Sequence, residues 1–234
     1  MRTKEFLSVR GIEFDSIDVT THPTGMDLLR ELGARSIPVV SRGRDFVFAQ
    51  AISDVVAFLG LDEDVGPELS MPELAAKLDM VLAAAARYVA QVPDDRLGDK
   101  LPGRDRAYRV LFHHIFNIAD ATISAMESGE PVNYEALTAP PPDDMQTVAD
   151  IVAYGEEVRA RVAGWWESGP KPDPVDTYYG PHPLHEIFER TVWHPAQHVR
   201  QLMLIHEMLG IETDGPLGDE DFRGLPLPEQ VWDG

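Results

Sequence analysis

The chain has 234 residues, 44% of them hydrophobic, which is enough for one large domain or two ordinary ones. It carries 40 acidic and 20 basic residues, and the resulting strong negative charge argues against nucleic acid or a membrane surface as a partner. The absence of cysteine excludes disulfides, thiolate nucleophiles and cysteine-ligated metals.

The first sixty residues alternate short helical and strand patterns. Neither a secretory signal nor an apolar run of the roughly 20 residues that span a membrane is evident, so we expect a cytoplasmic protein. Phe14, Ile17 and Leu28 are among the apolar side chains expected to point inward. The pattern predicts, in chain order, a helix at 1–10, a strand at 12–19, a helix at 23–32, strands at 36–40 and 45–49, and a helix at 52–61.

This order of elements in residues 1–61 resembles a glutaredoxin, of the thioredoxin fold. The matching segments are residues 3–8 (TKEFLS), 11–14 (GIEF), 18–19 (DV), 32–33 (LG), 37–40 (IPVV) and 59–61 (LGL). The resemblance implies that Pro38 follows a cis bond and that the backbone of Ile37 contacts the cysteine moiety of glutathione or a similar thiol.

The family's first strand and its Cys-x-x-Cys loop would lie before Thr3, where Met1 leaves no room for them. Without a thiolate this domain cannot carry out thiol–disulfide exchange. We therefore expect a partial, redox-inactive domain, or a chain that starts downstream of the true start. A structural or dimerising role is favoured over retained thiol binding. A homodimer would follow if a second chain replaced the missing strand.

The remainder of the chain predicts a helical domain. Residues 62–69 form an acidic linker, and Ser70 with Glu73 fits a capping box at the start of the next helix. Four long amphipathic helices predict a four-helix bundle over 70–210, followed by an extended tail at 211–234. The expected helices lie at 70–92, 104–126, 146–166 and 184–209. The whole chain is then an α+β protein.

Two histidines in the last helix form a candidate metal site. His194 and His198 are four residues apart, so they lie on one face of a helix and can bind one ion. A catalytic zinc site has three protein ligands. The third could be His113 or His114, and helical phase favours His114 because its neighbours along the helix are apolar. Pro195 should kink the helix, which could either aim the two rings at one point or separate them.

The spacing of these histidines resembles the DinB-like metalloprotein superfamily. The resemblance covers roughly 70–210 and rests on residues 111–115 (LFHHI) and 194–202 (HPAQHVRQL). It implies that one histidine of the second helix joins the His-x3-His pair. The family includes thiol-dependent S-transferases and a maleylpyruvate isomerase. Candidates for residues that support the ligands are Asp120, Glu189 and Gln201.

The resemblance implies a zinc or nickel site that activates a low-molecular-weight thiol towards a small-molecule electrophile. Glutathione is the thiol suggested by the glutaredoxin-like domain. Two alternatives stay open from the residues alone. One is a non-catalytic metal-binding or stress-response module, and the other is a metal-dependent hydrolase that uses water.

Overall fold

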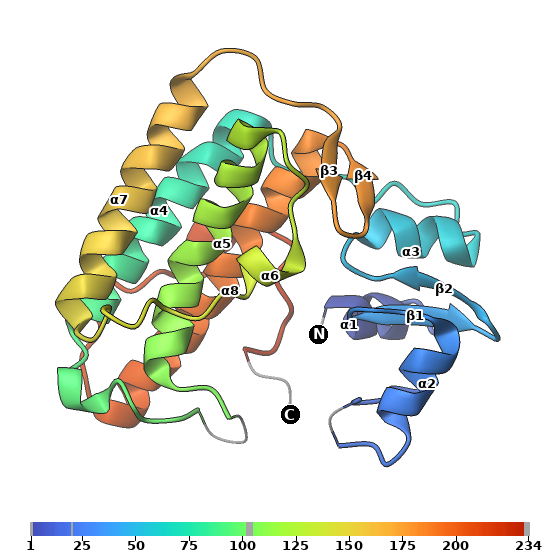
Figure 1. The fold of residues 1–234 in the computed structure, drawn as a ribbon, viewed down its shortest axis with the longest axis horizontal. Coiled ribbons are helices and arrows are strands. Elements are labelled where there is room, and N and C mark those ends of the chain that lie inside the picture. The colour runs from blue at the N-terminus through green and yellow to red at the C-terminus, as the bar shows by residue number, and fades with distance from the viewer. Residues whose placement is uncertain (1, 20, 102–104, 232–234) are drawn as a thin grey trace. The chain divides into compact units, whose positions relative to one another are not determined.

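A computed structural model describes residues 2–19, 21–101 and 105–231. The fold is mostly helical with two small antiparallel sheets, in line with the expected α+β class (Figure 1). The chain divides into two compact units, one running to Gly66 and the other starting at Pro67. Each unit has its own hydrophobic core. No helix among the described residues is both long and apolar enough to cross a membrane.

The first unit is built around a β-hairpin and a small core. Strands β1 (Val39–Arg42) and β2 (Asp45–Phe48) pair antiparallel, with Val39 opposite Phe48. Gly43 makes the turn at a φ of 64°, a conformation that glycine adopts without strain. The helices of this unit are α1 (Arg2–Val9), α2 (Gly25–Leu32) and α3 (Ile52–Leu59). Side chains of α1 and α3 form most of its core.

The strand predicted at 12–19 is wrong, because these residues adopt no regular secondary structure. Phe14 and Ile17, expected inside, are 39% and 44% exposed. Leu28 on α2 is also exposed, at 38%. Alternating apolar residues favour an extended backbone, but a strand also needs a neighbour to pair with its N–H and C=O groups. Strands β1 and β2 pair with each other, and no described segment pairs with 12–19.

The second unit contains four long helices that pack as a bundle (Figure 1). These are α4 (Met71–Ala90), α5 (Tyr108–Ser128), α7 (Val148–Glu167) and α8 (Leu184–Leu209). Helices α4 and α5 each pack mainly against α7 and α8. This arrangement makes α5 and α8 neighbours along their length, which allows side chains from both to share one site.

The start of α4 and the end of α8 follow the signals expected from the sequence. The Glu73 carboxylate accepts the Ser70 N–H at 2.8 Å where α4 begins, and α8 ends at Gly210 with a φ of 69°. Helix α5 starts later than predicted, at Tyr108, because Ala107 is extended and forms a β-bridge with Lys100. Residue 104, the predicted start, lies outside the described residues.

Short elements occupy segments that were predicted as loop or tail. The loop at 171–183 contains a second hairpin, and the tail carries a one-turn helix rather than being fully extended. These elements are η1 (Asp94–Arg96), α6 (Tyr134–Leu137), β3 (Val175–Thr177), β4 (Gly180–His182) and α9 (Asp219–Phe222). The tail packs on the bundle through buried Phe222 and Leu225, and Lys77 of α4 donates to the Asp221 carbonyl at 2.6 Å.

Candidate metal centre

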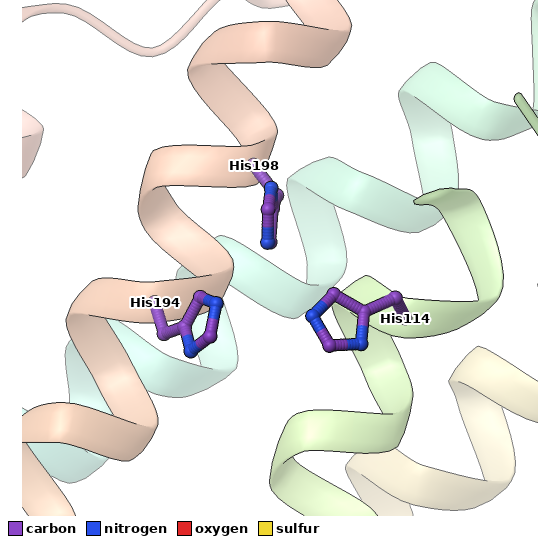
Figure 2. A group of neighbouring side chains, drawn as sticks. All are labelled: His114, His194 and His198. Atoms are coloured by element: carbon purple, nitrogen blue, oxygen red, sulfur yellow. The ribbon is translucent and has the colours of Figure 1, made fainter. Parts of the chain in front are cut away.

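Three histidines from two bundle helices converge on one point (Figure 2). His194 and His198 project from α8 and His114 projects from α5, and one nitrogen of each ring lies within 4.8 Å of the other two. The ring centroids are 5.0 to 5.4 Å apart. Helix α8 continues through Pro195, which is buried, so the proline does not separate the two rings.

The neighbouring His113 lies outside this cluster. Its ring stacks on Tyr154 of α7 with centroids 5.2 Å apart, and the Tyr154 hydroxyl donates to Asp120 at 2.9 Å. One step along a helix rotates a side chain by about 100°, so consecutive histidines cannot face the same space. His114 therefore faces α8, whereas His113 faces α7.

The electrostatics of the cluster keep two of its histidines neutral at physiological pH. Burial, with a smaller contribution from the neighbouring His198, lowers the pKa of His114 to about 2. Burial and His198 also hold the pKa of His194 well below its ordinary value. Neutral imidazole is the form that binds metals, because its lone pair is not occupied by a proton.

The His194 ring contains a buried polar atom that lacks a hydrogen-bond partner among the described residues. Nδ1 of His194 is buried and forms no hydrogen bond with the described residues. Buried polar atoms without a partner are rare in folded proteins and call for an explanation such as a bound ion. His194 as a whole is half-buried, whereas His114 and His198 are buried, so the cluster is not sealed from solvent.

A glutamine one turn further along α8 supports His198. Its Oε1 lies 2.7 Å from Nδ1 of His198, and its Nε2 donates to the Val231 carbonyl at 3.0 Å. Of the three predicted supporting residues, Gln201 contacts a candidate ligand. Asp120 instead binds Tyr154 and Arg161, away from the cluster. Glu189 is buried on α8, and its role stays a prediction.

Two arginines that sequence reasoning missed influence the cluster. The positive charges of Arg190 and Arg106 both lower the pKa of His194 and of His114, after the effects of burial and of His198. Arg190 precedes His194 by one helical turn, so the four-residue spacing could have indicated it. Arg106 precedes the start of α5, and its position depends on the tertiary fold.

The predicted thiol contact in the first unit has a mixed outcome. The bond between Ile37 and Pro38 is cis, as the resemblance implies. However, the Ile37 carbonyl accepts a hydrogen bond from Nε2 of Gln50 at 2.9 Å. Part of the backbone that would contact a thiol is thus engaged by the protein's own side chain.

No protein-family model matches the chain, and no curated protein matches it.

Proposed function

We propose that the second unit binds one divalent metal ion, zinc or nickel, through His114, His194 and His198. The observation that carries this proposal is the convergence of three imidazoles from α5 and α8 on one point. Imidazole nitrogen suits zinc and nickel, and three protein ligands are typical of catalytic zinc sites, which keep a fourth position open.

We further propose that the protein is a transferase that uses this site to activate a low-molecular-weight thiol towards a small electrophile. A bound ion would lower the pKa of a thiol in its fourth position, favouring loss of the thiol proton at neutral pH. The sulfur then bonds to carbon of the electrophile, which releases its leaving group. The charges of Arg190 and Arg106 support this role because they favour an anion beside the histidines.

The choice of a thiol over water rests on the resemblance to DinB-like and glutaredoxin-like proteins. Glutathione is the first thiol to test, with Ile37 and Pro38 as candidate backbone contacts. A hydrolase would use water in the same position, and a non-catalytic module would hold the metal without turnover. All three versions need the same ligands, so metal binding and turnover require separate experiments.

Metal binding is tested by the zinc and nickel content of purified protein after controlled loading. We expect about one ion per chain, as for a single three-histidine site. H114A, H194A and H198A should each lose more affinity than the roughly 10- to 100-fold that removal of a supporting residue costs. H113A is the matched control, since it removes the adjacent histidine, and it should retain the ion. Unchanged metal content in all three ligand variants would disprove the site.

Turnover is tested with a generic aryl halide or epoxide in the presence and absence of glutathione. The transferase proposal predicts product only with both thiol and metal, and loss of that product in H194A. Hydrolysis of the epoxide without thiol would favour the hydrolase instead. Metal binding without any turnover would favour the non-catalytic module.

A further inference from the structure

A short C-terminal segment is bound to α8 beside the histidine cluster. Residues 228–231, which we call the strap, present consecutive backbone carbonyls to side chains of this helix. Arg200 donates to the carbonyls of Pro228 at 2.7 Å and Glu229 at 2.9 Å. Gln197 donates to the next two carbonyls of the strap, at 3.3 and 2.8 Å. Arg200 also donates to Oε1 of Gln197 at 2.9 Å, so the two anchoring side chains support each other.

The strap also contacts Gln201, which in turn contacts a candidate ligand. A backbone carbonyl can only accept, so the contact with Val231 requires the amide nitrogen of Gln201 to face the strap. The amide oxygen must then face His198. Because that oxygen can only accept, Nδ1 of His198 must carry the ring proton, which leaves the Nε2 lone pair available for a metal.

We propose that the strap is part of the metal site, with Gln201 as a positioning residue that transmits its effect to His198. This inference rests on the metal site proposed above. Supporting hydrogen bonds of this kind set the tautomer and orientation of a ligand, and their loss typically lowers metal affinity roughly 10- to 100-fold. The strap would thus couple the ordering of the C-terminal segment to metal affinity.

The first test measures zinc affinity by competition with a chromophoric chelator. Q201L removes both hydrogen bonds and should weaken zinc binding roughly 10- to 100-fold. Q91L is the matched control. The Gln91 side-chain amide also bonds the C-terminal backbone at both ends: it donates to the Glu212 carbonyl and accepts from the Asp214 N–H. These bonds do not involve the three candidate ligands. Q91L should bind zinc within about 3-fold of wild type, well below the loss expected for a supporting residue.

The second test separates the strap from Gln201 itself. Q197L/R200M removes the other anchors of the strap while Gln201 stays, and we expect zinc affinity to fall about 10-fold. The loss of the positive charge of Arg200 would by itself raise the affinity for a zinc cation, so it cannot explain a fall. In Q201E, either carboxylate oxygen can accept the Nδ1 proton of His198. The strap is then no longer needed to set the orientation of this side chain. In the Q201E background, Q197L/R200M should therefore not lower zinc affinity.

The third test needs no metal. Nitrogen-15 NMR of the imidazole rings in chelator-treated protein should show the proton of His198 on Nδ1 in wild type and a mixture of tautomers in Q201L. Thermal unfolding of each metal-free variant checks that it is folded.

The outcomes separate this inference from the proposed function. Wild-type affinity in Q201L, or equal losses in Q201L and Q91L, would overturn the inference while leaving the three-histidine site intact. An equal effect of Q197L/R200M in both backgrounds would show that the strap does not act through Gln201. A wild-type protein that fails to bind zinc or nickel would overturn the metal site, and this inference with it.

Discussion

At the scale of single residues, the second unit contains a further buried histidine whose hydrogen bonds define its protonation. His206 on α8 has no exposed surface. Its Nε2 donates to the Tyr88 carbonyl at 2.9 Å, and its Nδ1 lies 2.9 Å from the Thr213 hydroxyl. Burial lowers the pKa of His206, and the contact with Tyr88 offsets part of this effect. His206 is therefore a neutral structural residue that joins α8 to α4 and to the start of the tail.

This environment predicts how His206 contributes to stability at different pH values. The folded-state pKa lies below the ordinary value of about 6.5, so the unfolded chain binds more protons as the pH falls. The contribution is fully present above pH 6.5 and is lost as the pH falls from there towards the folded pKa. Relative to H206Q, the free energy of unfolding of the wild type should fall by at most about 1.4 kcal/mol for each unit of decrease in pH. Urea unfolding at pH 7.5 and 5.5, with chelator present, measures the difference.

The candidate ligands are present in both proteins, so their titration cancels in this comparison. Parallel stability changes in the wild type and H206Q between the two pH values would contradict a lowered pKa for His206.

At the scale of elements, the packing of α7 against α5 depends on Gly155. A Cβ atom at this position would lie 2.6 Å from the ring of Phe116, which is fully buried and has little room to move. The two helices approach closely here, and α5 carries His114 on another face. Glycine is the residue that allows this contact without displacing the aromatic ring.

We expect G155A to destabilise the protein by about 1–3 kcal/mol, as overpacking of a close-packed core does. Gly164, exposed on the same helix with nothing within 4 Å of its Cβ position, is the control. G164A should be stabilising by up to about 1 kcal/mol, because alanine has the higher helix propensity. Urea unfolding of both variants tests the pair, and a G155A protein as stable as wild type would disprove the close contact.

At the scale of the whole molecule, the proposed metal site and its support lie entirely in the second unit. All three candidate ligands, Gln201 and the strap follow Pro67, and this unit has a contiguous core of its own. We expect residues 67–234 to fold cooperatively when expressed alone and to bind zinc as tightly as the full chain. Zinc competition and thermal unfolding of that fragment provide the test, and a folded fragment without zinc affinity would show that the first unit contributes to the site.

The first unit suggests an association between chains. Phe14, Ile17 and Leu28 are exposed there, and 12–19 pairs with no described strand. A second chain that paired with 12–19 would satisfy the backbone N–H and C=O groups of this segment. We propose a homodimer through this unit, for which light scattering should give about twice the chain mass of 26.0 kDa. A monomer at micromolar concentration would contradict it, and F14S/I17S should shift a dimer towards monomer.

The sequence alone was sufficient for the features that depend on local periodicity. The apolar period of α8, its closing Gly210 and the Ser70–Glu73 capping box predicted the helices and their ends within a few residues. The same periodicity favoured His114 over His113 as the partner of His194 and His198. These results follow because a side chain's direction on a helix depends on its position along that helix.

The tertiary structure decided what depends on partners distant in the chain. The alternation at 12–19 did not become a strand because no neighbour pairs with it, and the start of α5 moved because Lys100 bridges Ala107. The convergence of the rings despite Pro195, and the link from the strap through Gln201 to His198, likewise depend on the tertiary structure. Hydrogen bonds between residues thirty positions apart leave no periodic signal in a sequence, so only the packed chain reveals them.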